Sequence, residues 1–181
     1  MPGVIVICAL GFAMAGEARE LADQLASSDV AEARAAAEAL MLLGPAAAPV
    51  ASALVRATAH EDEATREYAV AALEELGPPS IDDLGELAKL LRAEPLDVAY
   101  WAATLLGRLG EDAAPATAML AAVLDDDRAV LPVRERAAWA LGRIGPKAIS
   151  ASDVLRRAAA SDEARLARLA TAALDSITAA E

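Results

Sequence analysis

The chain has 181 residues, of which 56% are hydrophobic and only 3% aromatic, so its apolar content is mostly alanine and leucine. Both residue types favour helix, and β-branched runs are scarce after residue 7, so we predict an all-α protein. The 28 Asp and Glu residues against 16 Lys and Arg give a formal net charge of −12. This acidity, together with the lack of a basic cluster interleaved with aromatic residues, argues against a nucleic-acid partner.

The N-terminal segment is typical of a secretory signal peptide. Residues 4–15 carry no charge, and Ala13-Met14-Ala15 has the small-x-small form that signal peptidase accepts before Gly16. We therefore expect a signal peptide over residues 1–15 and a repeat domain over residues 16–181, exported to the periplasm or secreted. If residues 1–15 instead form an apolar cap on the first repeat, we expect a cytoplasmic protein. The apolar stretch is shorter than the roughly 20 residues that span a bilayer, so we expect no stable membrane anchor.

A local pattern of alanine, leucine and a closing glycine recurs along the chain. Its anchoring alanines lie 33, 33, 35 and 33 residues apart, and a fixed period in this range indicates stacked supersecondary units. The anchoring residues are Ala36, Ala69, Ala102, Ala137 and Ala170. The sequence therefore predicts a solenoid rather than a single globular core.

Each period is predicted to contain two helices, a first (A) helix and a second (B) helix. In residues 65–76 the apolar positions 69, 72, 73 and 76 form one helical face, and Gly77-Pro78-Pro79 ends the helix. A B helix follows, with leucines spaced along residues 81–91. Residues 17–27 are predicted to form a lone B helix before the array, and residues 164–179 a lone A helix after it, as terminal caps.

The junctions between a B helix and the next A helix are polar, and each offers an acidic first turn to the helix that follows. The third junction, residues 125–132, is two residues longer than the others. It begins with Asp125-Asp126-Asp127, which lacks the spacing of a calcium-binding EF-hand loop. We interpret this triplet as a solvated helix stop followed by an N-cap.

The segment Val133–Pro146 (VRERAAWALGRIGP), with its echo at Thr65–Pro78, resembles HEAT-like repeats of the short type first named from phycobiliprotein lyases. The resemblance covers about residues 17–180. It implies a right-handed α-α superhelix of about four helical hairpins with terminal half-repeats, whose B helices line a concave face that holds another macromolecule. The arginine that bridges neighbouring repeats in this family is present only as Arg66 and Arg134, so we expect an incomplete ladder.

We expect no catalytic, metal or cofactor site. One histidine and one cysteine are too few for a Cys/His zinc site. The HEAT-like hydroxylases carry several His-Glu pairs that ligate two irons, whereas this chain has only His60-Glu61. We interpret His60 as a polar residue at the end of a B helix.

Candidate protein-binding residues are of two kinds. Tyr100 and Trp101 form an aromatic pair of the composition found in binding hot spots, and we predict that Tyr100 points mainly to solvent. Trp101 has an alternative role, shared with Tyr68, in filling the seam between repeats. Basic residues near the ends of B helices complement the helix dipole or form a basic rim for an acidic partner peptide. These basic candidates are Arg56, Lys89 and Arg92, with Arg156 and Arg157 at the corresponding end of the last B helix.

The sequence as a whole predicts a non-enzymatic scaffold that binds a protein partner. Two alternatives remain open: an accessory subunit of a bilin-lyase-like enzyme, and a structural array without a specific ligand. The identity of the partner and the oligomeric state do not follow from the sequence.

Overall fold

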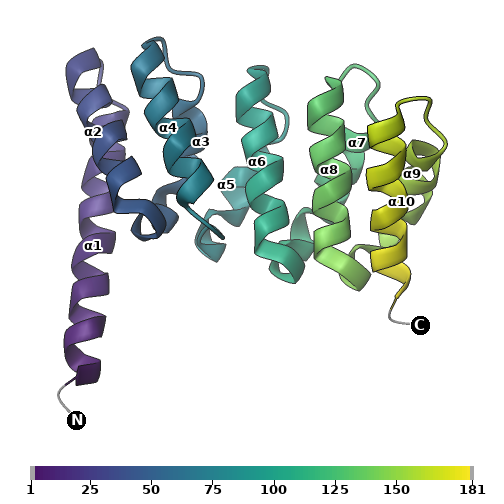
Figure 1. The fold of residues 1–181 in the computed structure, drawn as a ribbon, viewed down its shortest axis with the longest axis horizontal. Coiled ribbons are helices and arrows are strands. Elements are labelled where there is room, and N and C mark those ends of the chain that lie inside the picture. The colour runs from purple at the N-terminus through teal and green to yellow at the C-terminus, as the bar shows by residue number, and fades with distance from the viewer. Residues whose placement is uncertain (1–2, 180–181) are drawn as a thin grey trace. The chain divides into compact units, whose positions relative to one another are not determined.

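The computed structural model describes the backbone of residues 3–179 and the side chains of residues 14–179. Within these residues the regular structure is entirely helical and no strand occurs (Figure 1). The α-helices are α1 (Gly3–Leu25), α2 (Val30–Leu43), α3 (Ala51–Ala57), α4 (Glu63–Glu75), α5 (Leu84–Leu90), α6 (Leu96–Leu109), α7 (Thr117–Asp125), α8 (Leu131–Ile144), α9 (Ser152–Ala159) and α10 (Ala164–Thr178). Four 3-10 helices join them: η1 (Gly44–Val50), η2 (Ile81–Asp83), η3 (Gly110–Ala116) and η4 (Gly145–Ala151). The prediction of an all-α array of helical hairpins is confirmed.

Glycine forms the turn inside each hairpin, as the sequence predicted. Gly44, Gly110 and Gly145 have φ of +52°, +61° and +69°, and each opens a 3-10 helix that leads into the B helix. Only glycine adopts positive φ without a steric penalty, so the A helix ends there. Gly77 also has positive φ, but residues 76–80 are not helical, and only the short η2 precedes α5.

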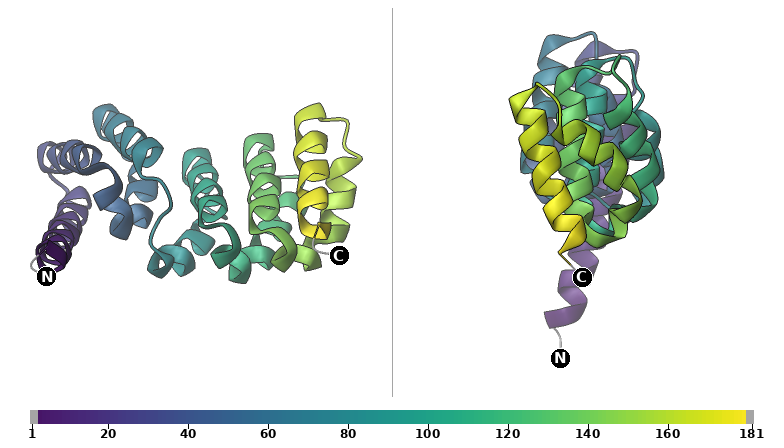
Figure 2. Two further views of the ribbon diagram at one scale, coloured as in Figure 1. Left: turned by 60° about the horizontal axis from the view of Figure 1, so that its bottom comes forward. Right: turned by 90° about the vertical axis from the view of Figure 1, so that its right-hand side faces the viewer.

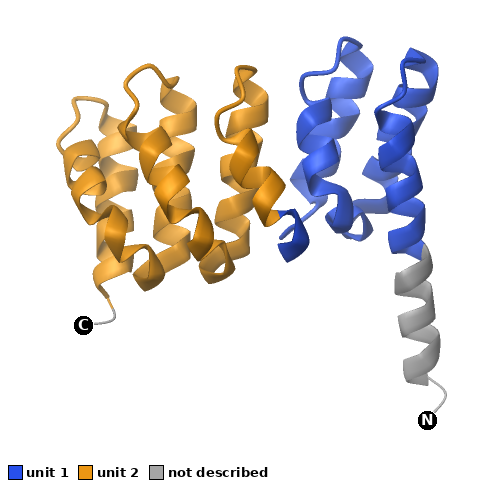
Figure 3. Cartoon of the chain, turned by 180° about the vertical axis from the view of Figure 1, so that it is seen from behind, with its two compact units in different colours: residues 1–83 blue, residues 84–181 orange. Residues whose placement is uncertain are grey.

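The chain divides into two compact units, residues 1–83 and residues 84–181 (Figure 3). In unit 1, helix α2 packs against α1 and α4, and α3 packs against α4. In unit 2, the A helices α6, α8 and α10 pack side by side, and the B helices α7 and α9 also touch (Figures 1 and 2). Every complete hairpin contributes an equivalent, fully buried leucine from its B helix: Leu54, Leu87, Leu120 and Leu155.

Two glycines let neighbouring A helices of unit 2 approach closely. A Cβ atom added to Gly107 of α6 would lie 2.2 Å from a ring carbon of Trp139 in α8. A Cβ atom added to Gly142 of α8 would lie 3.0 Å from the Cα atom of Ala173 in α10. The first glycine makes room for an aromatic ring, and the second makes room for a backbone.

One helical run in the described residues, Val30–Ala57, is long and apolar enough to cross a membrane by length and composition alone. Its most apolar window has a mean hydropathy of 1.6, and a third of that window is buried. The structure turns this run at Gly44 and divides it into α2, η1 and α3, which pack against α1 and α4. We therefore interpret it as the first hairpin of the array.

The terminal half-repeats are both present. Helix α1 is continuous from Gly3, so the predicted B helix of residues 17–27 is the second half of a longer helix, and it buries Ala18 and Leu25. Most of the predicted signal peptide, residues 1–13, has side chains outside the described residues. At the other end α10 buries Leu166, Ala170 and Ile177, as expected of a lone A helix.

The junctions cap fewer helices than the sequence predicted. Asp29 caps α2, and Asp62 caps α4 through the N–H of Thr65. The aspartate triplet does not cap α8: Asp126 accepts instead from the N–H of Arg128, and α8 begins after Val130 without a side-chain cap. The two added residues carry the triplet too far from the first turn of α8 to reach its N–H groups.

Arg66 and Arg134 hold their own junctions rather than a neighbouring repeat. Arg66 donates to the carbonyl oxygens of His60 and Glu61, and Arg134 donates to that of Leu124. Successive repeats are bridged by other ion pairs: Arg34–Asp62, Lys147–Glu111, Arg157–Asp125 and Arg165–Glu135.

The Arg34–Asp62 pair joins α2 to α4 within unit 1. Arg34 donates from Nε and Nη2 to the two carboxylate oxygens of Asp62, at 3.1 and 2.6 Å. The same carboxylate accepts from the N–H of Thr65 at 2.9 Å. The Arg34 side chain, and after it the Thr65 N–H, hold the pKa of Asp62 well below its ordinary value. The ionised carboxylate therefore stabilises unit 1.

Unit 1 is expected to lose this contribution in acid. Because folding lowers the pKa of Asp62, the contribution is complete above the unfolded carboxyl pKa of about 4 and declines as pH falls below it. Urea unfolding should separate the wild type from Asp62→Asn most clearly at about pH 7, and the separation should narrow steadily below about pH 4. Asparagine is the matched substitution because it still caps a helix.

A separation that does not change with pH would contradict this account. The wild type and Asp62→Asn must be compared with each other at each pH, because the free energy of unfolding also depends on pH through Asp83. Burial raises the pKa of its carboxyl group, against the opposing effect of hydrogen bonds from Ser52, so protonation of Asp83 favours the folded state. Its effect is common to both proteins and cancels in the difference.

Candidate functional site

Trp101 is buried on α6. It has 9% of its surface exposed, and it meets Tyr100 edge to face at 5.9 Å between ring centroids. The guanidinium carbon of Arg108 lies 5.7 Å from the centre of the Trp101 ring. Of the two roles predicted for Trp101, its burial therefore favours packing over a free binding surface.

Tyr100 does not point mainly to solvent, and that prediction was wrong. Its side chain is half-buried because Arg136 of the neighbouring helix α8 lies over its ring, 4.8 Å from the ring centre, and donates to its hydroxyl group. The same guanidinium group lies 5.4 Å from the centre of the Trp139 ring. A helical wheel of α6 alone cannot show this cover, since it comes from the next repeat.

The predicted basic residues are divided between the two units. Arg56 lies in unit 1, beside a shallow groove of about 220 Å³ that also includes His60. Lys89, on α5, is paired with Glu86 at 2.5 Å. Arg92 lines a larger groove in unit 2.

His60 has a structural role in its junction. Its Nδ1 atom accepts a hydrogen bond from the N–H of Asp62 at 3.0 Å, and its carbonyl oxygen accepts from Arg66. Among the residues that the structure describes, no three His, Cys, Asp or Glu side chains come together in a way that could hold a metal ion.

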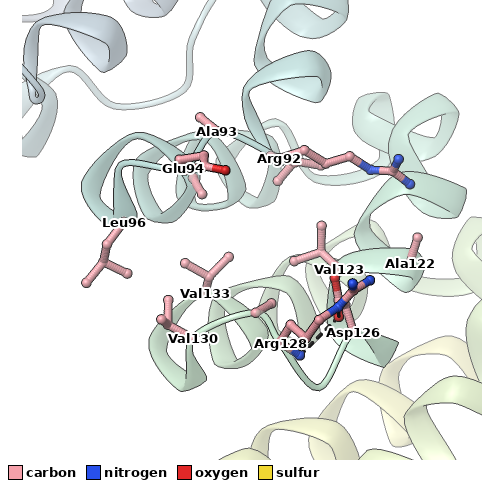
Figure 4. Close-up of a pocket in the computed structure, with 13 residues that line it drawn as sticks. Arg92, Ala93, Glu94, Leu96, Ala122, Val123, Asp126, Arg128, Val130 and Val133 are labelled. Atoms are coloured by element: carbon pink, nitrogen blue, oxygen red, sulfur yellow. Dashed lines mark hydrogen bonds and ion pairs between the residues drawn. The ribbon is translucent and has the colours of Figure 1, made fainter.

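The larger groove, which we call the junction groove, has a volume of about 500 Å³. It is formed by the end of α5 and the segment that follows it, the start of α6, the end of α7, and the long third junction with the start of α8 (Figure 4). Leu96 and Val130 are 42% and 48% exposed, and they lie with Val133 at one end of the groove. Apolar side chains left this open to solvent are typical of surfaces that a partner covers.

Two arginines lie toward the other end of the junction groove (Figure 4). Arg128 donates through its backbone N–H and its Nε atom to Asp126, at 3.0 and 3.3 Å, and these bonds lower the pKa of Asp126. Arg92 makes no ion pair with any residue of the described part of the chain, and Figure 4 shows its side chain extending toward Ala122. The groove thus combines an apolar end with a cation that has no counter-ion.

Arg92 could be predicted from the sequence as a candidate, but the groove around it could not. The signals were the two-residue lengthening of the third junction and the two apolar residues, Leu96 and Val130, that sit at the starts of A helices outside the buried faces. Neither signal shows that the two segments lie opposite each other.

No family model matches the chain, and no curated protein sequence is similar to it. Solved structures are similar in fold. Two engineered proteins align at 21% and 20% identity, each with a TM-score of 0.60, covering 89% and 90% of this chain. The alignment covers 79% of the first engineered protein but only 48% of the second, so the chain spans about half the length of the latter.

A designed armadillo repeat protein in complex with the peptide (KR)4 aligns at 17% identity and a TM-score of 0.60, over 87% of this chain and 80% of its own. Identities this low show the fold alone. The chain is a helical-repeat solenoid of armadillo-like architecture.

Proposed function

We propose that this protein is a non-enzymatic scaffold that holds a segment of a protein partner. The observation that carries the proposal is the junction groove, where exposed Leu96 and Val130 lie in the same depression as the unpaired Arg92. An apolar patch with convergent polar groups is the usual form of a binding surface. Helical repeats support this role because stacked hairpins present extended surfaces, and one similar structure is a designed armadillo protein in complex with a peptide.

Within this proposal, we assign the helical repeats to the short HEAT-like type, on the motif Val133–Pro146. This assignment of the repeat type does not add a separate function. A subunit that grips a substrate protein for a bilin lyase would share the motif, and a purely structural array would share the fold. The scaffold, the lyase subunit and the structural array predict different results in one experiment.

The experiment is capture followed by reconstitution. The full chain is immobilised, exposed to native extract, and each captured protein is identified, purified separately and mixed back with the chain. A scaffold should form a saturable complex of fixed stoichiometry in analytical ultracentrifugation. Failure of every captured protein to re-form a complex would favour the structural array, and a change in bilin absorbance on mixing would favour the lyase accessory.

We also propose export, on the residue pattern of residues 1–15. N-terminal sequencing of the protein purified from its source would decide: a chain that starts at Gly16 supports export, and a chain that starts at Met1 or Pro2 contradicts it.

A further inference from the structure

The repeat pattern explains why Arg92 lacks a counter-ion. Twenty residues after each of the first four anchoring alanines the chain has a basic residue in three repeats and an alanine in one: Arg56, Lys89, Ala122 and Arg157. Twenty-three residues after the same alanines it has Ala59, Arg92, Asp125 and Ala160. Both positions lie at the end of the B helix or just beyond it.

The seam between α7 and α9 shows what these two positions do. Arg157 of α9 donates to Asp125 of α7 from Nη2 and Nε, at 2.8 and 3.1 Å. In this seam, therefore, the twentieth position of one repeat lies within ion-pair distance of the twenty-third position of the repeat before it. This ion pair joins α7 to α9, and the two helices are in contact.

The seam between α5 and α7 has the same two positions but a different pair of residues. The twenty-third position is Arg92 and the twentieth is Ala122, and both line the junction groove. Arg92 thus faces a methyl group where the next seam has an ion pair. The groove has space beside Arg92, next to Ala122, for a carboxylate from another molecule.

The remaining walls define the rest of the occupant. Leu96, Val130 and Val133 form an apolar end that suits one aliphatic side chain, and the volume of about 500 Å³ suits a few residues of extended peptide. Arg128 adds a second guanidinium group near Arg92, although Asp126 already engages it, and Glu94 also lines the groove. The overall charge of −12 opposes an acidic ligand at long range, but salt screens that field beyond about 8 Å, so the contact charges decide.

Resting on the proposed scaffold function, we propose that the junction groove binds a short extended peptide segment that carries an aliphatic side chain and, within a few residues of it, a carboxylate. The aliphatic side chain packs against Leu96, Val130 and Val133. The carboxylate pairs with Arg92 above Ala122.

The test uses the full chain and defined peptides. Fluorescein-labelled, amidated peptides carry one leucine and one glutamate with a spacer of about one to four serines between them, which covers the length of the groove at roughly 3.3 Å per residue. Matched peptides replace the glutamate by glutamine or lysine, or the leucine by serine. Fluorescence anisotropy should show binding of at least one Leu–Glu peptide and a loss of about tenfold or more in affinity for each matched peptide.

Variants of the protein locate the site. Arg92→Gln should weaken the Leu–Glu peptide about tenfold and leave the Leu–Gln peptide unchanged. Ala122→Glu supplies the missing carboxylate from the chain, so it should abolish Leu–Glu binding while helical circular dichroism is retained. Ala118→Glu is the matched control: it adds the same charge at an exposed site one turn away on α7, outside the groove, and should bind as the wild type does.

Two results would overturn the proposal: binding of none of the Leu–Glu peptides, or an equal effect of Ala122→Glu and Ala118→Glu. The scaffold function is judged separately. If a reconstituted partner binds the wild type, Arg92→Gln and Ala122→Glu with the same affinity, the scaffold stands and the groove assignment fails. If no partner reconstitutes but Leu–Glu peptides bind as described, the groove assignment stands without it.

Discussion

Trp101→Ala is expected to lower the free energy of unfolding of unit 2 by about 3–5 kcal/mol, because it removes a large aromatic side chain from a buried position on α6. Trp101 is only 9% exposed, and its loss also removes the edge-to-face contact with Tyr100 and the stacking of Arg108. Urea unfolding followed by far-ultraviolet circular dichroism measures the change. Trp139 remains as a fluorescent probe of the same unit.

Tyr100→Phe is the control for this substitution. It keeps the ring that meets Trp101 and removes only the hydroxyl group to which Arg136 donates, so we expect a loss of about 1 kcal/mol. If Trp101→Ala were as stable as the wild type, Trp101 would not contribute to the core, and Tyr100 and Trp101 would again be candidates for a binding hot spot. If the expected loss is found, weaker partner binding by Trp101→Ala reports unfolding rather than a lost contact.

The second large effect is expected at Gly107. Alanine is the better helix former by about 1 kcal/mol, yet Gly107→Ala should destabilise unit 2 by about 1–3 kcal/mol because its Cβ atom would overlap the Trp139 ring. Gly85→Ala, on α5, is the matched substitution, since nothing lies within 4 Å of the added atom. It should stabilise the unit by up to about 1 kcal/mol.

Urea unfolding of both variants gives the comparison. Opposite signs are expected, and equal effects of the two substitutions would contradict the packing seen between α6 and α8. Trp139→Leu supplies a further check. In a double-mutant cycle it should recover part of the Gly107→Ala loss, because the shorter side chain leaves room for the Cβ atom.

The parts of the fold that follow from local chemistry could be predicted from the sequence. The turns at Gly44, Gly110 and Gly145 depend on positive φ, and a glycine at the end of a helix pattern predicts such a turn without further information. The buried B-helix leucines repeat at the period of the array, so their burial follows from spacing. These features need no knowledge of which helix lies beside which.

The candidate site depends on that knowledge. Tyr100 was placed on the exposed side of its own helix, and Arg136 covers it from α8. The junction groove needs Arg92, just after α5, and Ala122, on α7, to face each other. The aspartate triplet likewise has the composition of a helix cap but not the position, because the longer junction separates it from α8.

Gly107 and Gly142 also bear on how such an array changes by gain or loss of repeats. Each glycine is matched to a particular residue of the helix that follows it, a tryptophan ring in one case and the backbone of Ala173 in the other. The corresponding positions in the first two repeats are Met41 and Glu74. The repeats therefore share a backbone arrangement but are not interchangeable. Duplicating or moving one of the last hairpins would succeed only if the hairpin that follows it were duplicated or moved together with it.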